Sequence, residues 1–139
     1  HKLPKDSPIA SADPLKIGAV VAIDGPGDPA SEITLFEQAC GVPAGTALFG
    51  GTPAEQPQRW ADGTPQARLP LGAKSALISA SLFLSPTAAA RWISEARKGK
   101  DTASALILGD TGHFEVIAPG SPVWPQVEAF LTEQLKVKP

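Results

Sequence analysis

Residues 75–108 read SALISASLFLSPTAAARWISEARKGKDTASALIL, and this stretch decides the fold. It begins with a run that is almost continuously apolar or small, Ser75 to Phe83, and it ends with a second such run, Ala103 to Leu108. Runs without alternation of polar and apolar residues are typical of strands that are buried on both faces of a sheet. We therefore predict a strand at each end of the stretch.

The residues between these two runs carry the signals of a helix. Ser85 is suited to cap the first turn, Pro86 suits the first helical position, and Gly99 suits the end. One stripe of the predicted helix is apolar and consists of Ala89, Trp92, Ile93 and Ala96. The order strand, helix, strand favours two parallel strands joined by a right-handed crossover.

The rest of the chain extends this pattern in both directions. A third β-rich run lies at Ile17 to Ile23, and Ser121 and Pro122 precede a second amphipathic stretch. The apolar face of that stretch consists of Val123, Val127, Phe130, Leu131 and Leu135. We predict an α/β fold in a single domain that spans residues 1–139.

A long segment separates the first two predicted strands. Residues 24–73 are rich in glycine and proline, with helical signals near Ser31 to Ala39 and Pro53 to Trp60. Such a long connection usually builds a pocket or a lid. We therefore expect residues 24–73 to shape a binding site.

Composition excludes several classes of partner. The chain has 12 basic and 14 acidic residues, a net charge of −2 and 42% hydrophobic residues. There is no basic cluster suited to nucleic acid or an anionic membrane surface, and no apolar run of the roughly 20 residues that a membrane span needs. The single cysteine, Cys40, excludes an internal disulfide framework, and neither its spacing nor that of the histidines suits a zinc site.

A parallel sheet of only three strands would leave both of its edges open, whereas such sheets usually have more strands. We therefore expect Ile17 to Ile23 to pair with a strand on an upstream segment or on a second chain. The chain begins at His1 without an initiator methionine, which favours the upstream segment.

His113 is the strongest candidate for chemistry. It lies in the segment GDTGHFE, residues 109–115, directly after the third predicted strand. Open α/β sheets place their ligands and catalytic groups at this end of the strands.

The chain resembles the α/β-hydrolase superfamily, in its esterase, lipase and acyl-peptidase-like branch. The resemblance rests on Gly112-His113-Phe114 before a terminal helix, and on the segments GGTPAEQP (50–57), LPLG (69–72) and SPVW (121–124). It covers nearly the whole chain. It implies that the three strands are the last three of a larger parallel sheet.

The resemblance also implies a role for His113. In this family a serine on a Gly-x-Ser-x-Gly turn attacks an ester or amide, and a histidine takes its proton. No such turn occurs in the sequence. The nucleophile and the oxyanion hole would therefore lie on the upstream segment or second chain, and the chain alone should be inactive. Serine-type acyl transfer needs no metal or organic cofactor, and we expect none.

The third member of the triad departs from the family. The family usually carries an aspartate after the second of these strands, where this chain has Leu82-Phe83-Leu84. In some α/β-hydrolases the acid follows the preceding strand, which points to Asp24 or Asp28 here. The competing interpretation is that Asp28 caps the next helix and Asp24 binds turn amides. Asp110 and Glu115, near His113 in sequence, are expected to face solvent.

Other patterns favour less specific interpretations. Residues 45–52, GTALFGGT, have the glycine spacing of a phosphate loop, but Gly51 stands where the lysine is needed. Cys40 is expected to be a small buried hydrophobic residue, and Trp60, Trp92 and Trp124 are expected to pack on helices.

Other classes of function remain beside the hydrolase. His113 could be an ordinary loop histidine, and the chain a non-catalytic α/β-hydrolase-like module or an independent small binding domain. The apolar Leu82-Phe83-Leu84 segment favours the non-catalytic module.

Overall fold

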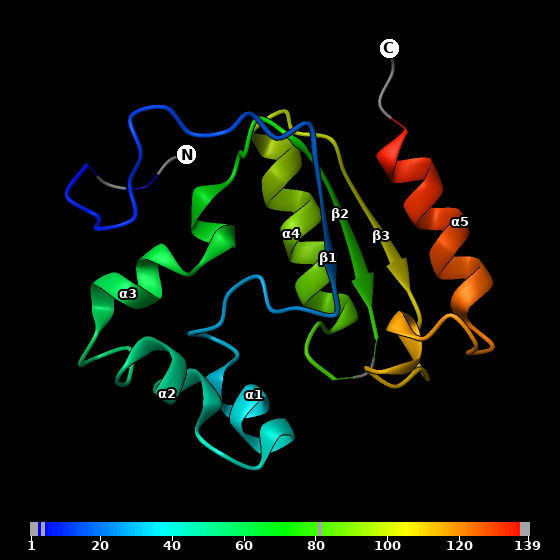
Figure 1. The fold of residues 1–139 in the computed structure, drawn as a ribbon, viewed down its shortest axis with the longest axis horizontal. Coiled ribbons are helices and arrows are strands. Elements are labelled where there is room, and N and C mark those ends of the chain that lie inside the picture. Colours follow the sequence, from blue (N-terminus) through cyan, green and yellow to red (C-terminus); the bar gives the residue numbers. More distant parts are fainter. Residues whose placement is uncertain (1–2, 4, 81, 137–139) are drawn as a thin grey trace.

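A three-stranded parallel sheet forms the centre of the computed structural model, which describes residues 3, 5–80 and 82–136 (Figure 1). Its strands are β1 (Ala19–Ile23), β2 (Lys74–Ser79) and β3 (Ala103–Ile107), and β2 lies in the middle. Leu77 of β2 is in register with Ala22 of β1 and with Ala105 of β3. The predicted α/β class and parallel strands are confirmed.

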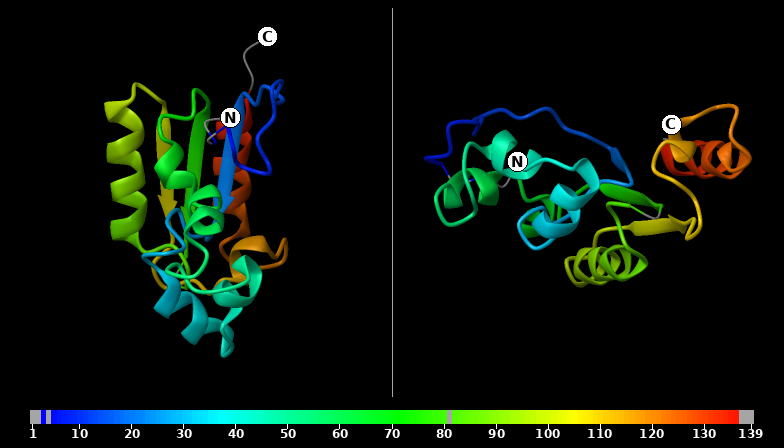
Figure 2. Two further views of the ribbon diagram at one scale, coloured as in Figure 1. Left: turned by 90° about the vertical axis from the view of Figure 1, so that its left-hand side faces the viewer. Right: turned by 90° about the horizontal axis from the view of Figure 1, so that it is seen from below.

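Two helices cover opposite faces of the sheet. Helix α4 (Pro86–Lys98) lies on one face and α5 (Trp124–Leu135) lies on the other (Figure 2). The core on the α4 side contains Leu77, Leu84, Ala89, Trp92, Ala96 and Ala103. The core on the α5 side contains Ile78, Ala80, Leu108, Val116 and Val127. Alternate residues of β2 thus serve different cores, which explains why its sequence is apolar without alternation.

The helix predicted from residues 85–99 is confirmed in detail. The Ser85 side chain accepts a hydrogen bond from the N–H of Ala88, with Oγ and N 3.1 Å apart, and Pro86 is the first residue of α4. Gly99 ends the helix, and its N–H donates to the carbonyl groups of the last turn. Ala89 and Ala96 of α4 are fully buried. Because their side chains are small, α4 can lie close to the sheet.

Two predicted strand boundaries are wrong by two residues or more. The second strand ends at Ser79 and not at Phe83, because the Asp24 carboxylate binds the N–H groups of Ala80, Phe83 and Leu84. Those groups are therefore not available to a sheet partner. Ser81, within the predicted strand, lies outside the described residues. At the other end of the chain, Ile17 and Gly18 precede β1, which begins at Ala19.

The start of the last helix also differs from the prediction. The Ser121 hydroxyl donates to the carbonyl oxygen of Glu115, 2.6 Å away, and so does not cap the helix. Helix α5 begins at Trp124, with Pro125 in its first turn. The short 3₁₀ helix η2 (Glu115–Ile117) precedes α5 in the chain.

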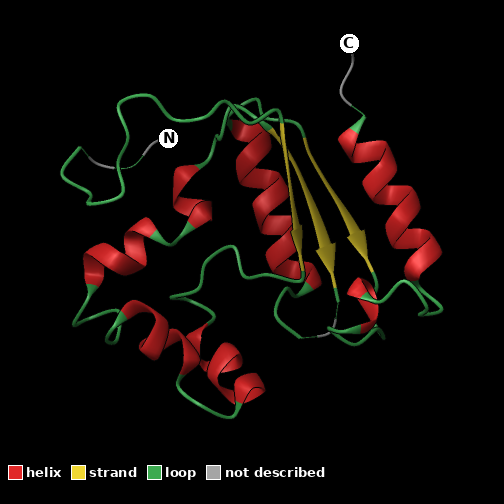
Figure 3. Cartoon of the chain, viewed as in Figure 1, coloured by secondary structure: helices red, strands yellow, loops and turns green. Residues whose placement is uncertain are grey.

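Residues 24–73 form a chain of short helices beside the sheet (Figure 3). These are α1 (Ile33–Cys40), α2 (Ala44–Phe49), α3 (Pro57–Asp62) and the 3₁₀ helix η1 (Pro65–Arg68). Helix α2 was not predicted, because its six residues are too few to show a clear period. The Gln66 N–H donates to the Gly27 carbonyl, 3.0 Å away, and this bond ties η1 to the segment that follows β1.

No helix in the described part of the chain is long and apolar enough to cross a membrane.

Candidate functional site

Asp24 follows β1 directly and is the most heavily hydrogen-bonded acidic side chain at the strand ends. Its side chain is fully buried. Oδ1 accepts the N–H groups of Ala80 and Leu84 at 3.0 and 3.1 Å, and Oδ2 accepts the N–H of Phe83 at 3.3 Å. The carboxylate therefore fixes the loop between β2 and α4.

The backbone of Asp24 has a left-handed conformation, with φ of 44°. A residue other than glycine adopts this region rarely, although aspartate tolerates it better than most. Backbone of this kind costs of order 1 kcal/mol and persists where the surrounding contacts require it. At Asp24 the contacts that require it are those of the buried carboxylate.

His113 reaches the same carboxylate from the loop after β3. Its Nδ1 lies 3.0 Å from Asp24 Oδ2, and 25% of its side chain is exposed. The loop is held in shape by the Glu115 carboxylate, which accepts the Gly112 N–H at 2.6 Å, and by the Thr111 N–H, which donates to the Leu108 carbonyl at 3.2 Å. The structure thus brings together two of the three predicted site residues.

Two aromatic rings flank the imidazole. Phe83 meets the His113 ring edge to face, with ring centres 4.8 Å apart and an angle of 88° between the planes. Phe114 lies against it with ring centres 5.2 Å apart. Among the described residues, none forms a hydrogen bond with Nε2. The ring is therefore held at Nδ1 and on its sides, and no described residue takes up the hydrogen-bonding capacity of Nε2.

Asp28 does not join this site. Its carboxylate accepts the N–H of Ser31 at 3.3 Å, and its carbonyl accepts the Ser31 hydroxyl at 3.1 Å. Asp28 forms a turn with Ser31, and the competing interpretation that it caps the next helix is wrong, because α1 has no side-chain cap. The competing interpretation of Asp24, that it binds turn amides, agrees with its three N–H contacts. Asp110 is exposed, as expected, and the exposed Glu115 carboxylate binds its own loop.

The segment Leu82-Phe83-Leu84 contributes in a way that sequence reasoning missed. It has no carboxylate, but the N–H groups of Phe83 and Leu84 bind the carboxylate of Asp24. Phe83 also provides the ring that contacts His113. No sequence signal marks backbone donors, because every residue except proline has one.

The weaker motifs have structural roles. Residues 45–52 form most of α2 and a turn in which the Gly51 carbonyl accepts the indole N–H of Trp60, at 2.9 Å. Trp60 and Trp92 are buried, and Trp124 packs against the core on the α5 side. Cys40 is the last residue of α1 and is exposed, so the expectation that it is buried was wrong. The left-handed Gly41 ends the helix there and leaves the thiol in solvent.

Within the described residues there is no group of three or more histidine, cysteine, aspartate or glutamate side chains that could hold a metal ion. Comparison with protein-family models, curated proteins and solved structures found no match to this chain.

Proposed function

We propose that this chain is the C-terminal part of a serine-type ester hydrolase of the α/β-hydrolase superfamily, with His113 as its general base and Asp24 as the residue that orients it. The observation that supports this most directly is the 3.0 Å contact between His113 Nδ1 and the buried Asp24 carboxylate, together with an Nε2 that has no hydrogen bond to any described residue. An imidazole that a carboxylate holds at Nδ1 supplies two of the three members of a catalytic triad, the histidine and the acid.

The chemistry follows from this arrangement. With Nδ1 donating its proton to Asp24, the lone pair of Nε2 can accept the proton of a serine hydroxyl as the serine oxygen attacks the ester carbonyl. The imidazolium then gives that proton to the departing alkoxide, and the acyl group stays on the serine. Water attacks this acyl-enzyme in the same way, which releases the acid. Asp24 stabilises the imidazolium that forms in each half.

The nucleophile would come from polypeptide beyond this chain, on a strand beside β1. In its support, β1 is apolar throughout but only partly buried, with Val20 37% exposed, whereas Leu77 and Ile78 of β2 are buried. A strand with this composition is suited to the interior of a larger sheet. Because the three strands are parallel, their carboxyl ends lie at the same end of the sheet. A parallel strand added beside β1 would end there as well.

The test uses the polypeptide that contains this chain and its upstream segment. We expect covalent labelling by a fluorophosphonate probe and hydrolysis of short-chain p-nitrophenyl esters. His113→Ala should lower kcat about 10³-fold or more, and Asp24→Asn should lower it about 10²-fold or more, as in other triads. Asp28→Asn is the matched control and should change kcat less than twofold. Absence of both labelling and hydrolysis, or activity that survives His113→Ala, would overturn the proposal.

A second candidate function is a non-catalytic module of the same fold. The observation in its favour is that Asp24 already has a structural role, since three backbone N–H groups bind it. In that case the contact with His113 would only fasten the loop after β3. The same probe separates the two candidates, because a non-catalytic module would remain unlabelled.

A further inference from the structure

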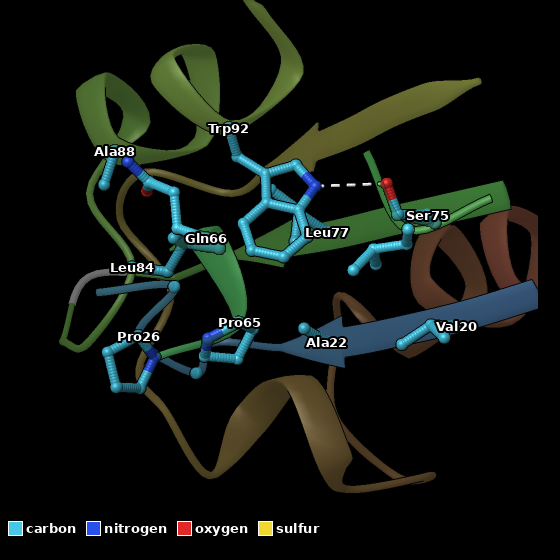
Figure 4. Close-up of a pocket in the computed structure, with 14 residues that line it drawn as sticks. Val20, Ala22, Pro26, Pro65, Gln66, Ser75, Leu77, Leu84, Ala88 and Trp92 are labelled. Atoms are coloured by element: carbon cyan, nitrogen blue, oxygen red, sulfur yellow. Dashed lines mark hydrogen bonds between the residues drawn. The ribbon is translucent and has the colours of Figure 1, made fainter. Parts of the chain in front are cut away.

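A partly open pocket of about 120 Å³ lies between β1, α4 and η1, on the α4 side of the sheet (Figure 4). Val20 and Ala22 form its β1 wall, Leu77 and Leu84 form its floor, and the ring of Trp92 closes one side. The lining is almost entirely apolar. The pocket is separate from the site formed by His113 and Asp24, because neither residue lines it.

One buried polar group faces this pocket. The Ser75 residue is buried, and its Oγ accepts the indole N–H of Trp92 at 3.0 Å, drawn as a dashed line in Figure 4. The indole N–H donates to Oγ, so this bond does not use the hydroxyl proton of Ser75, which can still be donated to an acceptor. In the part of the chain that the structure describes, no protein acceptor takes it. The pocket therefore offers the buried Ser75 hydroxyl as a hydrogen-bond donor on an apolar wall, and the partly buried side chain of Gln66 lines another side.

The position of this donor is fixed on both sides. Ser75 lies on the central strand, in register with Val20 of β1 and Ala103 of β3, and Trp92 lies in the middle of α4. A concave apolar lining with one rigid polar group is the usual form of a small-molecule site. The polar group sets the orientation of the ligand, and the apolar walls supply most of the binding free energy.

The size of the pocket limits its occupant. An apolar cavity of about 150 Å³ holds benzene, so a pocket of this size suits a ligand of five to seven heavy atoms at most. A charged ligand does not fit, because no charged side chain lines the pocket to compensate its desolvation.

We propose that the pocket walled by Val20, Ala22, Leu77, Leu84 and Trp92 binds a small uncharged carbonyl compound, such as a short ketone or ester, whose oxygen accepts the Ser75 hydroxyl proton. This inference does not rest on the proposed hydrolase function, because it needs neither His113 nor a missing serine. Leu84 links the two sites, because it lines the pocket and donates its N–H to Asp24.

The experiment is a titration of the 139-residue chain followed by NMR at the indole N–H of Trp92, assigned with Trp92→Phe. The probes are cyclopentanone and methylcyclopentane, which have the same number of heavy atoms and differ in the carbonyl oxygen. We expect a saturable shift with cyclopentanone, and we expect Ser75→Ala to bind cyclopentanone about fivefold more weakly than the parent, a factor that corresponds to one net hydrogen bond. Methylcyclopentane has no acceptor oxygen, so its binding should be the same in the parent and in Ser75→Ala.

Two variants on α4 keep the test decisive if Ser75→Ala fails to fold. Ala88 lines the pocket, so Ala88→Leu should fill it and remove the shift. Ala90→Leu is the matched control, because Ala90 is exposed on the same helix and should bind as the parent does. His113→Ala should also bind as the parent does, which separates this site from the hydrolase proposal. No saturable shift at Trp92, or undiminished binding by Ala88→Leu, would overturn the inference.

Discussion

Oδ2 of Asp24 lies 3.0 Å from Nδ1 of His113, although 89 residues separate the two in the chain. The contact joins the carboxyl end of one edge strand, β1, to the loop after the other edge strand, β3, across the end of β2. The central strand contributes too, because the backbone that follows it binds the other oxygen of Asp24. One buried carboxylate thus fixes the relative positions of three strand ends.

Replacing Asp24 should therefore destabilise the whole chain. Asp24→Ala would leave three backbone N–H groups without their acceptor, two of them buried, and we expect a loss of about 3 kcal/mol in the free energy of unfolding. Asp24→Asn keeps one acceptor oxygen and should cost less, about 1 to 2 kcal/mol. Urea denaturation followed by circular dichroism measures both changes.

Asp28→Asn is the control for this measurement, because Asp28 follows the same strand but forms only a local turn. We expect a change of less than about 0.5 kcal/mol. If Asp24→Ala were as stable as this control, the carboxylate would not hold the strand ends together.

The tautomer of His113 gives a second prediction. Of the two neutral tautomers of the ring, a carboxylate at Nδ1 favours the one that carries its proton on Nδ1. Imidazole side chains that are free in water favour the other tautomer, with the proton on Nε2. Long-range ¹H–¹⁵N correlation spectra of the ring should therefore show a protonated Nδ1. In Asp24→Asn, whose amide can donate to the ring, the proton should move to Nε2. A protonated Nε2 in the parent chain would contradict the role of Asp24 in orienting the ring.

The sequence predicted the three strands and α4 because each depends on a local pattern. Ser85, Pro86 and Gly99 act within one turn of their own helix, so their spacing is sufficient evidence. The end of β2 was not predictable in this way, because it is set by Asp24, which lies more than 50 residues earlier in the chain. Local propensity favours a strand through Phe83, and a tertiary hydrogen bond overrides it.

The candidate site was predictable only as a choice. The sequence named His113 from its loop and offered Asp24 and Asp28 on equal terms, since both follow β1 beside glycine and proline. The structure separates them, because Asp24 is buried against His113 and Asp28 binds Ser31. The sequence predicted that residues 24–73 would shape a binding site, and part of that segment lines the pocket beside Trp92. The walls that come from β1, β2 and α4 carried no sequence signal, because no motif marks their residues.

The cap of α4 provides a third prediction. Ser85→Ala removes the acceptor of the Ala88 N–H and should lower the free energy of unfolding by about 1 kcal/mol. Ser94 is exposed in the middle of the same helix, where alanine is the better helix former. Ser94→Ala should therefore leave the stability unchanged or raise it by a few tenths of a kcal/mol. Equal losses in the two variants would show that the hydroxyl of Ser85 does not act as a cap.

Glu32, directly before α1, gives the stability of the chain a dependence on pH. Burial is the main cause that raises the pKa of Glu32 above its usual value of 4.5; Arg91 opposes this and Asp28 adds to it. Its Oε2 is buried without a hydrogen-bond partner in the described part of the chain, and its Oε1 lies 3.8 Å from an Arg91 nitrogen. The folded chain therefore binds the Glu32 proton more tightly than the unfolded chain does.

It follows that ionising Glu32 costs stability as the pH rises from 4.5 through the raised pKa, and that this cost is absent below 4.5. Glu32→Gln has no charge to ionise, so its free energy of unfolding should improve relative to the parent between about pH 4 and pH 7. Arg91→Gln removes the charge that lowers the pKa of Glu32, so this variant should lose stability more steeply than the parent over the same range. Urea denaturation at intervals of pH measures all three proteins. A difference between Glu32→Gln and the parent that moved the other way with pH would mean that Arg91 stabilises the ionised carboxylate more than burial penalises it.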